Sequence, residues 1–151
     1  MNVTTKGRYA LRVMMDLAQQ PGDGFVSLKG VAERQGVSMK YLEMIVGQLK
    51  RAALVESSRG KEGGYRLSRG PEAYTVGEIL RCLEDKLAPV SCIRDGGVQC
   101  AHAALCPTIP MWKELDEITN RYLDSVKLSD LLDGERWNQR PPLPGAEEGG
   151  L

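Results

Sequence analysis

Apolar positions recur at helical spacing through the first fifty residues. Between Thr5 and about Gln19 they form one stripe of an amphipathic helix, made of Ala10, Val13, Met14, Leu17 and Ala18. The run 21–24, Pro-Gly-Asp-Gly, ends this helix. Ser27 and Ser38 are each placed to cap a shorter helix, and Gly36 supplies the turn between the two. The pattern predicts a helix-turn-helix.

A β-hairpin is predicted directly after these helices. Residues 54–57 and 65–67 are expected to form its two strands, and the glycine-rich, basic run 58–64 is expected to form its tip. A helix-turn-helix followed by such a hairpin is a winged helix. The expected fold is therefore mainly α, with a small β-hairpin wing.

The pattern changes after the hairpin. Thr75 and Glu78 have the spacing of a capping box and predict another helix. Residues 88–106 show no periodicity and are expected to form a loop. A long helix is expected from about Met111 to Lys127, and its apolar stripe either pairs with a second subunit or packs against its own core. The candidate dimerisation residues on it are Trp112, Leu115, Ile118, Tyr122 and Val126.

These elements suggest four segments. Residues 1–86 are expected to form a winged helix-turn-helix DNA-binding domain, and residues 87–107 a cysteine-containing loop. Residues 108–134 are expected to form a dimerisation helix and a short C-terminal helix. Residues 135–151 are rich in Pro, Gly and Glu and are expected to be a disordered tail.

The net charge of zero conceals an asymmetry between the two halves. Residues 1–70 hold twelve Lys/Arg and six Asp/Glu, whereas residues 71–151 hold eight and fourteen. A basic first half is typical of a surface that meets a polyanion. There is no apolar run of the ~20 residues that span a bilayer and no apolar stretch of a signal peptide at the N-terminus. We therefore expect a cytoplasmic protein with no membrane partner and with reduced thiols.

The second helix of a helix-turn-helix presents its N-terminal residues to base edges. The candidates on this helix are Ser38, Met39, Lys40, Tyr41 and Glu43, with Arg51 near its end. A carboxylate beside DNA is repelled by phosphate, so Glu43 either accepts from cytosine N4 or is a solvated helix residue. Arg51 either touches phosphate or caps helix carbonyls.

The tip of the wing is the second candidate DNA contact. It carries Arg59, Gly60 and Lys61. Arginine suits a narrow minor groove, and glycine allows close backbone approach. Glycines also serve a tight hairpin turn, which is the alternative interpretation of the glycine-rich loop.

Three of the four cysteines, Cys92, Cys100 and Cys106, lie within fifteen residues of each other. Clustered thiolates suit an iron–sulfur cluster or zinc. Zinc sites usually show closer cysteine pairs, which favours iron–sulfur. A metal-free thiol switch is the third alternative. His102 is the only histidine, either the fourth ligand or a solvated loop residue, and Cys82 is expected to be a structural core cysteine.

Several motifs together resemble a known family. They are KGRYAL at 6–11, VSMKYLE at 37–43, LV at 54–55 and RGxxGGY at 59–65. This combination resembles the Rrf-two family of winged-helix regulators, and in type its iron–sulfur cluster regulators such as IscR. The resemblance covers roughly residues 1–132. It implies a homodimer with one winged helix per subunit, a long dimerisation helix and a palindromic operator in double-stranded DNA.

The resemblance also implies a cofactor. Cys92, Cys100 and Cys106 match the family's three cluster-binding cysteines, which implies an iron–sulfur cluster, [2Fe–2S] with [4Fe–4S] as the alternative. IscR-like relatives carry a histidine three residues after the third cysteine, where this chain has Ile109. Related nitric-oxide sensors take an acidic ligand from the partner's first helix, where this chain has Arg8. Asp95, a water or a small thiol are further alternatives for the fourth ligand.

The expected function is a DNA-binding transcriptional regulator, for instance a repressor, that senses iron–sulfur, redox or nitric-oxide status. By resemblance, its targets would be genes of iron–sulfur assembly or cysteine metabolism. The alternatives are a cluster-free thiol- or zinc-dependent repressor and, in another class, a small redox or cluster-carrier protein. The chain has no glycine-rich nucleotide fingerprint and a single histidine, so we do not expect an enzyme.

Overall fold

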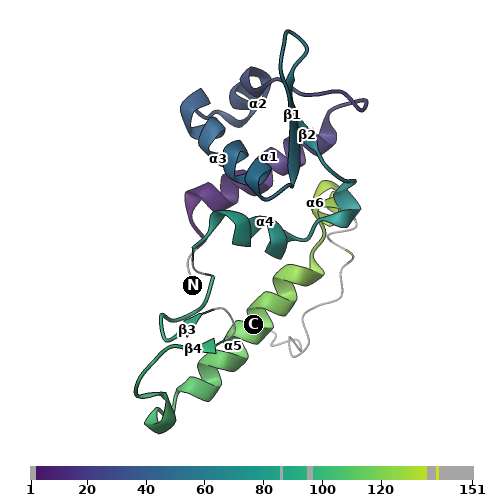
Figure 1. The fold of residues 1–151 in the computed structure, drawn as a ribbon. Helices are drawn as coiled ribbons and strands as arrows, with labels where there is room; N and C mark the ends of the chain where they lie inside the picture. Colours follow the sequence, from purple (N-terminus) through teal and green to yellow (C-terminus); the bar gives the residue numbers. More distant parts are fainter. Residues whose placement is uncertain (1–2, 86, 95–96, 136–138, 140–151) are drawn as a thin grey trace.

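The computed structural model describes residues 3–85, 87–94, 97–135 and 139. The head of the molecule comprises three helices and a hairpin: α1 (Thr5–Gln19), α2 (Leu28–Gln35), α3 (Met39–Arg51), β1 (Val55–Ser58) and β2 (Gly64–Leu67). There follow η1 (Pro71–Ala73), α4 (Val76–Leu83), β3 (Ile93–Arg94), β4 (Gly97–Val98), η2 (Ala103–Leu105), α5 (Ile109–Ser125) and α6 (Leu128–Leu132). The predicted winged helix-turn-helix is confirmed (Figure 1).

Local capping explains where the helices of the head begin. Ser27 Oγ accepts from the Gly30 amide at 3.2 Å, and Ser38 Oγ accepts from the Tyr41 amide at 3.1 Å. These bonds satisfy amides that a helix start leaves unpaired. Gly36 then ends α2 with φ of 65°, a left-handed conformation that glycine adopts without a Cβ penalty. Both predicted caps and the turn are therefore confirmed.

The wing is a two-stranded antiparallel sheet. Its register pairs Val55 with Leu67 and Ser58 with Gly64, so both strands lie within one residue of their predicted positions. A backbone bridge between Val26 and Tyr65, with both hydrogen bonds at 2.8 Å, fastens the wing to the segment before α2. A Cβ at Gly64 would run into the Val26 carbonyl, so this close approach requires glycine.

Two apolar clusters hold the chain together. The larger one joins α1, α2, α3 and β1, and its fully buried members include Met14, Leu42 and Ile45. Tyr74 lies in the same core, where its hydroxyl donates to the Leu54 carbonyl at 2.7 Å. The smaller one packs α4 against the end of α5 through Val76, Leu80, Leu87 and Val126. The second cluster attaches α5 to the head, and from there α5 runs outward (Figure 1).

The segment before α5 is more ordered than the predicted loop at 88–106. It contains the short β3–β4 pair, in which Ile93 is buried and pairs with Val98. Helix α5 begins at Ile109 with Pro110 in its first turn and ends at Ser125, two residues from each predicted limit. It ends there because the Val126 carbonyl accepts from the Val76 amide at 2.8 Å, which draws the backbone out of the helix.

The predicted tail, 135–151, lies outside the described residues apart from Glu135 and Gln139. Within the described ranges, no helix is both long and apolar enough to cross a bilayer.

Candidate DNA-binding face and cysteine loop

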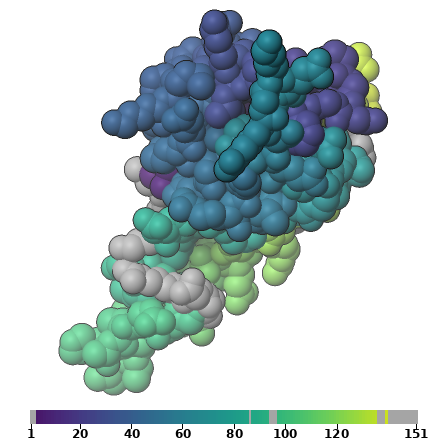
Figure 2. Space-filling view, turned by 45° about the horizontal axis from the view of Figure 1, so that its top comes forward, coloured from purple at the N-terminus to yellow at the C-terminus, as the bar shows by residue number. Residues whose placement is uncertain are grey.

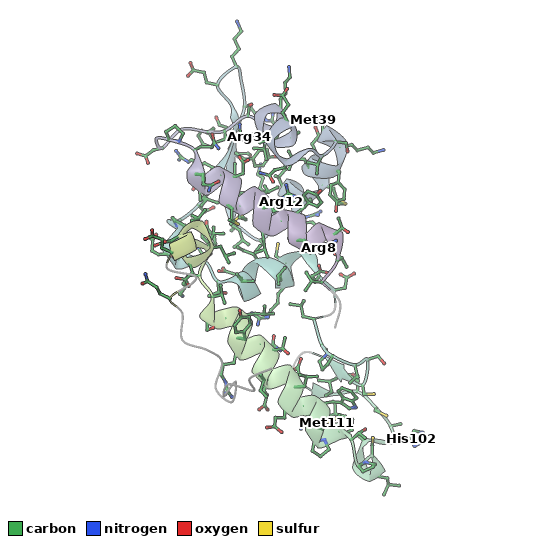
Figure 3. All side chains as sticks on the ribbon, turned by 180° about the vertical axis from the view of Figure 1, so that it is seen from behind. Arg8, Arg12, Arg34, Met39, His102 and Met111 are labelled. Carbon is green, nitrogen blue, oxygen red and sulfur yellow. The ribbon has the colours of Figure 1, made fainter. Side chains whose placement is uncertain are left out.

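The exposed face of α3 carries most of the predicted base-reading residues. Ser38, Met39, Lys40 and Glu43 are all exposed, and Tyr41 is half-buried. The Ser38 hydroxyl caps α3, so its first role is structural. Figure 3 shows Met39 on the head, beside the start of α3. The other side of α3 is buried through Leu42, Ile45, Val46 and Leu49, which fixes the face that it turns outward.

An aromatic support for α3 was not foreseen in the sequence. The ring of Tyr41 meets the ring of Tyr9 edge-on, with centroids 6.0 Å apart. The Arg12 guanidinium lies 4.8 Å from the centroid of the Tyr9 ring, and its Nε donates to Gln35 Oε1 at 2.9 Å. These contacts tie the start of α3 to α1 and α2. The Tyr9–Tyr41 and Arg12–Gln35 contacts join residues more than twenty positions apart, which local spacing does not reveal.

The wing tip stands clear of the head, as the space-filling view shows (Figure 2). Arg59, Gly60 and Lys61 are exposed there. Gly60 has φ of 106°, and its carbonyl accepts from the Gly63 amide at 3.1 Å, so glycine is needed for the turn itself. Arg51 is exposed in the last turn of α3. Its neighbour Lys50 donates to Ser57 Oγ at 2.5 Å and so links α3 to β1.

An ion pair between the buried carboxylate of Asp16 and the exposed guanidinium of Arg34 fixes α2 against α1. Asp16 is only 4% exposed, and its carboxylate accepts from Arg34 at 2.7 Å and from Gln35 at 2.8 Å. Burial by itself raises the pKa of the Asp16 carboxyl, but the hydrogen bonds from Arg34 and Gln35 outweigh it and leave the pKa lowered. Because α2 precedes the turn that leads to α3, this pair helps to set the angle of the predicted reading helix.

The three clustered cysteines lie at the far end of the molecule from the wing, around β3, β4 and η2 (Figures 1 and 3). Cys92, Cys100 and Cys106 are all free and half-buried. The β3–β4 pair folds the chain back so that the Gln99 amide donates to the Cys92 carbonyl at 2.7 Å. This turn brings Cys92 beside the residue that precedes Cys100.

Cys106 lies just before α5. Its Sγ is 3.2 Å from Thr108 Oγ1, and a hydrogen bond with this hydroxyl lowers the pKa of the Cys106 thiol. Backbone hydrogen bonds from Thr108 and Ile109 lower the pKa further. Such an environment favours the thiolate, which is the form that binds metals and attacks disulfides.

The three thiols of the cysteine loop are the kind of ligand that iron–sulfur clusters and zinc bind. In this structure, however, the described residues of the loop are not arranged around a common point as metal ligands would be. Among the residues that the structure describes, no three His, Cys, Asp or Glu side chains are grouped to hold a metal ion. His102 is exposed at the start of η2 and points away from the molecule (Figure 3). Asp95 lies outside the described residues. Ile109 is buried at the first position of α5.

Cys82 belongs to a different environment from the other three cysteines. It packs against the main core from α4, and its Sγ lies 3.6 Å from the Gln48 carbonyl. Burial raises the pKa of the Cys82 thiol. This is the setting of a structural cysteine, so Cys82 is a natural control for the clustered three.

Helix α5 presents an apolar stripe on its surface. Met111, Leu115 and Ile118 are 53%, 42% and 52% exposed, and their spacing places them on one side of the helix. Trp112 and Tyr122 are half-buried. Val126 is only 2% exposed and packs in its own subunit against α4. Val126, one of the predicted dimerisation residues, thus contacts its own subunit, whereas Met111, outside the predicted set, belongs to the exposed stripe.

Comparisons with known proteins agree with this architecture. The Rrf2 family, described as iron-dependent transcriptional regulator, matches residues 3–134. An HTH-type transcriptional regulator of Neisseria meningitidis is 40% identical over 133 residues, which make up 88% of each chain. The HTH-type transcriptional regulator CymR of Bacillus subtilis is 40% identical over 139 residues, 90% of this chain and 95% of its own.

A solved structure leads to the same family. T. potens IscR is similar with a TM-score of 0.70 and 39% sequence identity, covering 94% of this chain and 93% of that chain. The matched family spans the head, the cysteine loop and α5, so the likeness extends beyond the helix-turn-helix. The chain belongs to the Rrf2 family of transcriptional regulators.

Proposed function

We propose that this protein is a homodimeric regulator that binds a palindromic operator and whose DNA binding depends on the state of its cysteine loop. The observation that carries the proposal is the presence of two chemically distinct sites in one chain. One is a winged helix with exposed cations on α3 and on the wing tip. The other is a loop with three free thiols, joined to the head through α5 and α4.

The charges of the head support DNA as its ligand. Lys40, Arg51, Arg59 and Lys61 are all exposed there. Cations on one surface attract the phosphate backbone and make binding depend on salt, whereas contacts with base edges supply sequence preference. The proposed base-reading residues of α3 are Ser38, Met39, Tyr41 and Glu43. Gly60 is the proposed glycine that lets the backbone of the wing tip approach the DNA closely.

The cofactor proposed for the loop is an iron–sulfur cluster held by Cys92, Cys100 and Cys106. Three thiols within fifteen residues supply three of the four ligands that such a cluster usually takes, and a solved family member is named IscR. When bound, the cluster would supply a redox- and nitric-oxide-sensitive group. His102, on the same loop, is the proposed fourth ligand. Its side chain points outward in this structure (Figure 3), so the loop would have to turn it toward the cysteines. Genes of iron–sulfur assembly or cysteine metabolism are the proposed targets.

A second candidate is a cluster-free thiol sensor. The observations that favour it are the lowered pKa of Cys106 and the absence of a grouped ligand set among the described residues. A thiolate at Cys106 is the reactive form for oxidation to sulfenic acid or a disulfide.

An anaerobic purification separates the two candidates. The measurement is the visible absorption spectrum together with iron and acid-labile sulfide per subunit. The proposed function predicts visible bands with matched iron and sulfide, their loss in Cys92→Ser, and their retention in the control Cys82→Ser. A protein that stays colourless after reconstitution, with oxidant-dependent DNA binding, would establish the thiol sensor instead.

A further inference from the structure

Gly47 lies at the centre of the outward face of α3. Lys40 lies seven residues before Gly47, Glu43 four residues before it, and Arg51 four residues after it. At this spacing all three lie on the same side of the helix as Gly47. All three are exposed. The buried positions of α3, among them Leu42 and Ile45, lie on the opposite side.

No contact among the described residues explains a glycine at position 47. A Cβ built on Gly47 would have no heavy atom of the described residues within 4 Å, apart from its own helix and chain neighbours. Its backbone is helical, and it is not among the glycines with positive φ. By contrast, a Cβ at Gly7 would run into the Glu84 carboxylate, and one at Gly77 would run into Asp124. Packing against neighbouring side chains therefore requires glycine at positions 7 and 77, whereas no such contact requires glycine at position 47 in the described structure.

A glycine in the interior of a helix is destabilising relative to alanine, because it loses more backbone entropy on folding. The described part of the subunit gains no packing in exchange at Gly47. A partner outside the subunit that approaches α3 more closely than a side chain would allow accounts for the glycine. The charges around Gly47 indicate that this partner is an anion. Lys40, Lys50 and Arg51 are all exposed cations on or beside the outward face of α3.

We propose that Gly47 is a contact position at which the DNA backbone approaches the backbone of α3. The inference rests on the proposed function of the head as a DNA-binding unit and adds a residue to it. A methyl group at position 47 would hold α3 away from the duplex and weaken the contacts that Lys40 and Arg51 make with phosphate. Glycine at position 47 thus makes the helix less stable than alanine would, but it allows DNA to approach the backbone of α3 more closely.

The test compares Gly47→Ala and Gly47→Leu with the wild type in thermal melting and in duplex binding, using an operator selected by the wild-type protein. Gly47→Ala should raise the melting temperature by about 2–4 °C, because alanine has a higher helix propensity than glycine. It should raise the dissociation constant for the operator about tenfold, as expected for modest overpacking, and leucine should raise it further. Gly24→Ala is the control, since its Cβ would also meet open space and it lies in the α1–α2 loop.

The outcomes separate this inference from the proposed function. Stabilised Gly47 variants that bind the operator as tightly as the wild type would overturn the role of Gly47 while leaving DNA binding intact. A wild-type protein that binds no duplex in a salt-dependent way would instead overturn the DNA-binding function itself. A lower melting temperature in Gly47→Ala would also contradict the inference, because it would reveal an internal need for glycine.

Discussion

Lys40 and Glu43 lie one helical turn apart on the exposed face of α3 and carry opposite charges. Phosphate should attract Lys40 and repel Glu43, so we expect their substitutions to have different effects on DNA binding. Lys40→Ala should weaken binding to all DNA sequences. It should also make the slope of log affinity against log salt concentration less steep by about 0.9, which corresponds to the loss of one phosphate contact. Glu43→Ala should leave overall affinity similar or higher and relax discrimination at one base pair. Selection on randomised operators measures the second effect, and an unchanged consensus would show that Glu43 does not read bases.

Asp16 gives the head a specific dependence on pH. Its pKa is lowered in the folded protein, so the pair with Arg34 stabilises the fold fully above the unfolded pKa of about 3.9 and is lost as pH falls through the lower folded value. At pH 7, Asp16→Asn should reduce the free energy of unfolding by about 2 kcal/mol, the value of a hydrogen bond to a charged group. Denaturant titrations from pH 7 down to pH 2 measure this difference.

The difference between wild type and Asp16→Asn should begin to narrow below about pH 4, because the carboxyl of the unfolded wild type is protonated first. It should be fully lost only below the lowered pKa of the folded protein, where the folded carboxyl becomes neutral as well. A difference that stays constant down to pH 2 would contradict the assignment. Glu56→Gln is the matched control, because Glu56 pairs with Arg66 at 3.0 Å with both side chains exposed. Removing an exposed pair should cost less than about 1 kcal/mol.

At the residue scale, the sequence predicts those side chains that bond to their own neighbours along the chain. Ser27 and Ser38 were identified as caps because a cap bonds an amide three residues away, which the printed sequence shows. Asp16 with Arg34, and Tyr9 with Tyr41, were not identified, because these partners meet only after helices pack. Val126 was grouped with the surface stripe because helical spacing alone does not show which side a neighbouring helix covers.

Among the elements, the approach of α1 to α4 depends on one small residue and one carboxylate. Glu84 Oε1 accepts from the Thr4 amide at 2.9 Å and from the Thr4 hydroxyl at 2.8 Å, at the start of α1. A Cβ at Gly7 would run into this oxygen. Gly7→Ala should therefore lower the free energy of unfolding by about 1–3 kcal/mol, as overpacking does.

A double-mutant cycle checks the cause of that loss. In a Glu84→Ala background, Gly7→Ala should cost much less, because the oxygen that it meets is gone and only the Leu80 side chain remains near. Equal costs in both backgrounds would mean that the effect of Gly7→Ala does not come from Glu84. Thermal melting of the four proteins supplies the cycle.

The elements themselves were largely predictable. Periodicity identified α1, α3 and α5, and the turn residues placed the hairpin within one residue of its observed strands. The β3–β4 pair was missed because two-residue strands carry no periodic signal, and they form here around the single buried Ile93. The cysteines were visible as a group in the sequence, whereas the spatial relation of their thiols depends on turns that local spacing does not encode.

At the scale of the whole molecule, the stripe of α5 is the proposed surface between two subunits. Ile118→Glu places a charge in the exposed apolar stripe and should convert the dimer to a monomer, since a buried unpaired charge is costly. Lys113→Glu introduces the same residue at an exposed position on another side of α5 and should leave the dimer intact. Sedimentation velocity distinguishes the two states, and an unchanged sedimentation coefficient for Ile118→Glu would place the interface elsewhere.

The distance between the two sites makes α5 central to any coupling between them. The head lies at one end, the cysteine loop at the other, and α5 with α4 joins them (Figure 1). A signal at the loop alters DNA binding only if the two loop states differ in how they hold the heads. In a dimer, a change at α5 would alter the relative orientation of two heads and thus the spacing of half-sites that they fit.

The most direct test of the central claim is the affinity of one protein for its selected operator with the cysteine loop in two states. Binding is measured anaerobically for the reconstituted wild type and for the same sample after iron and sulfide are removed, with Cys82→Ser as the control. We predict that affinity or operator preference changes between the two states in the wild type and in Cys82→Ser, and that Cys92→Ser stays fixed. Identical affinity and preference in both states of the wild type would contradict the account.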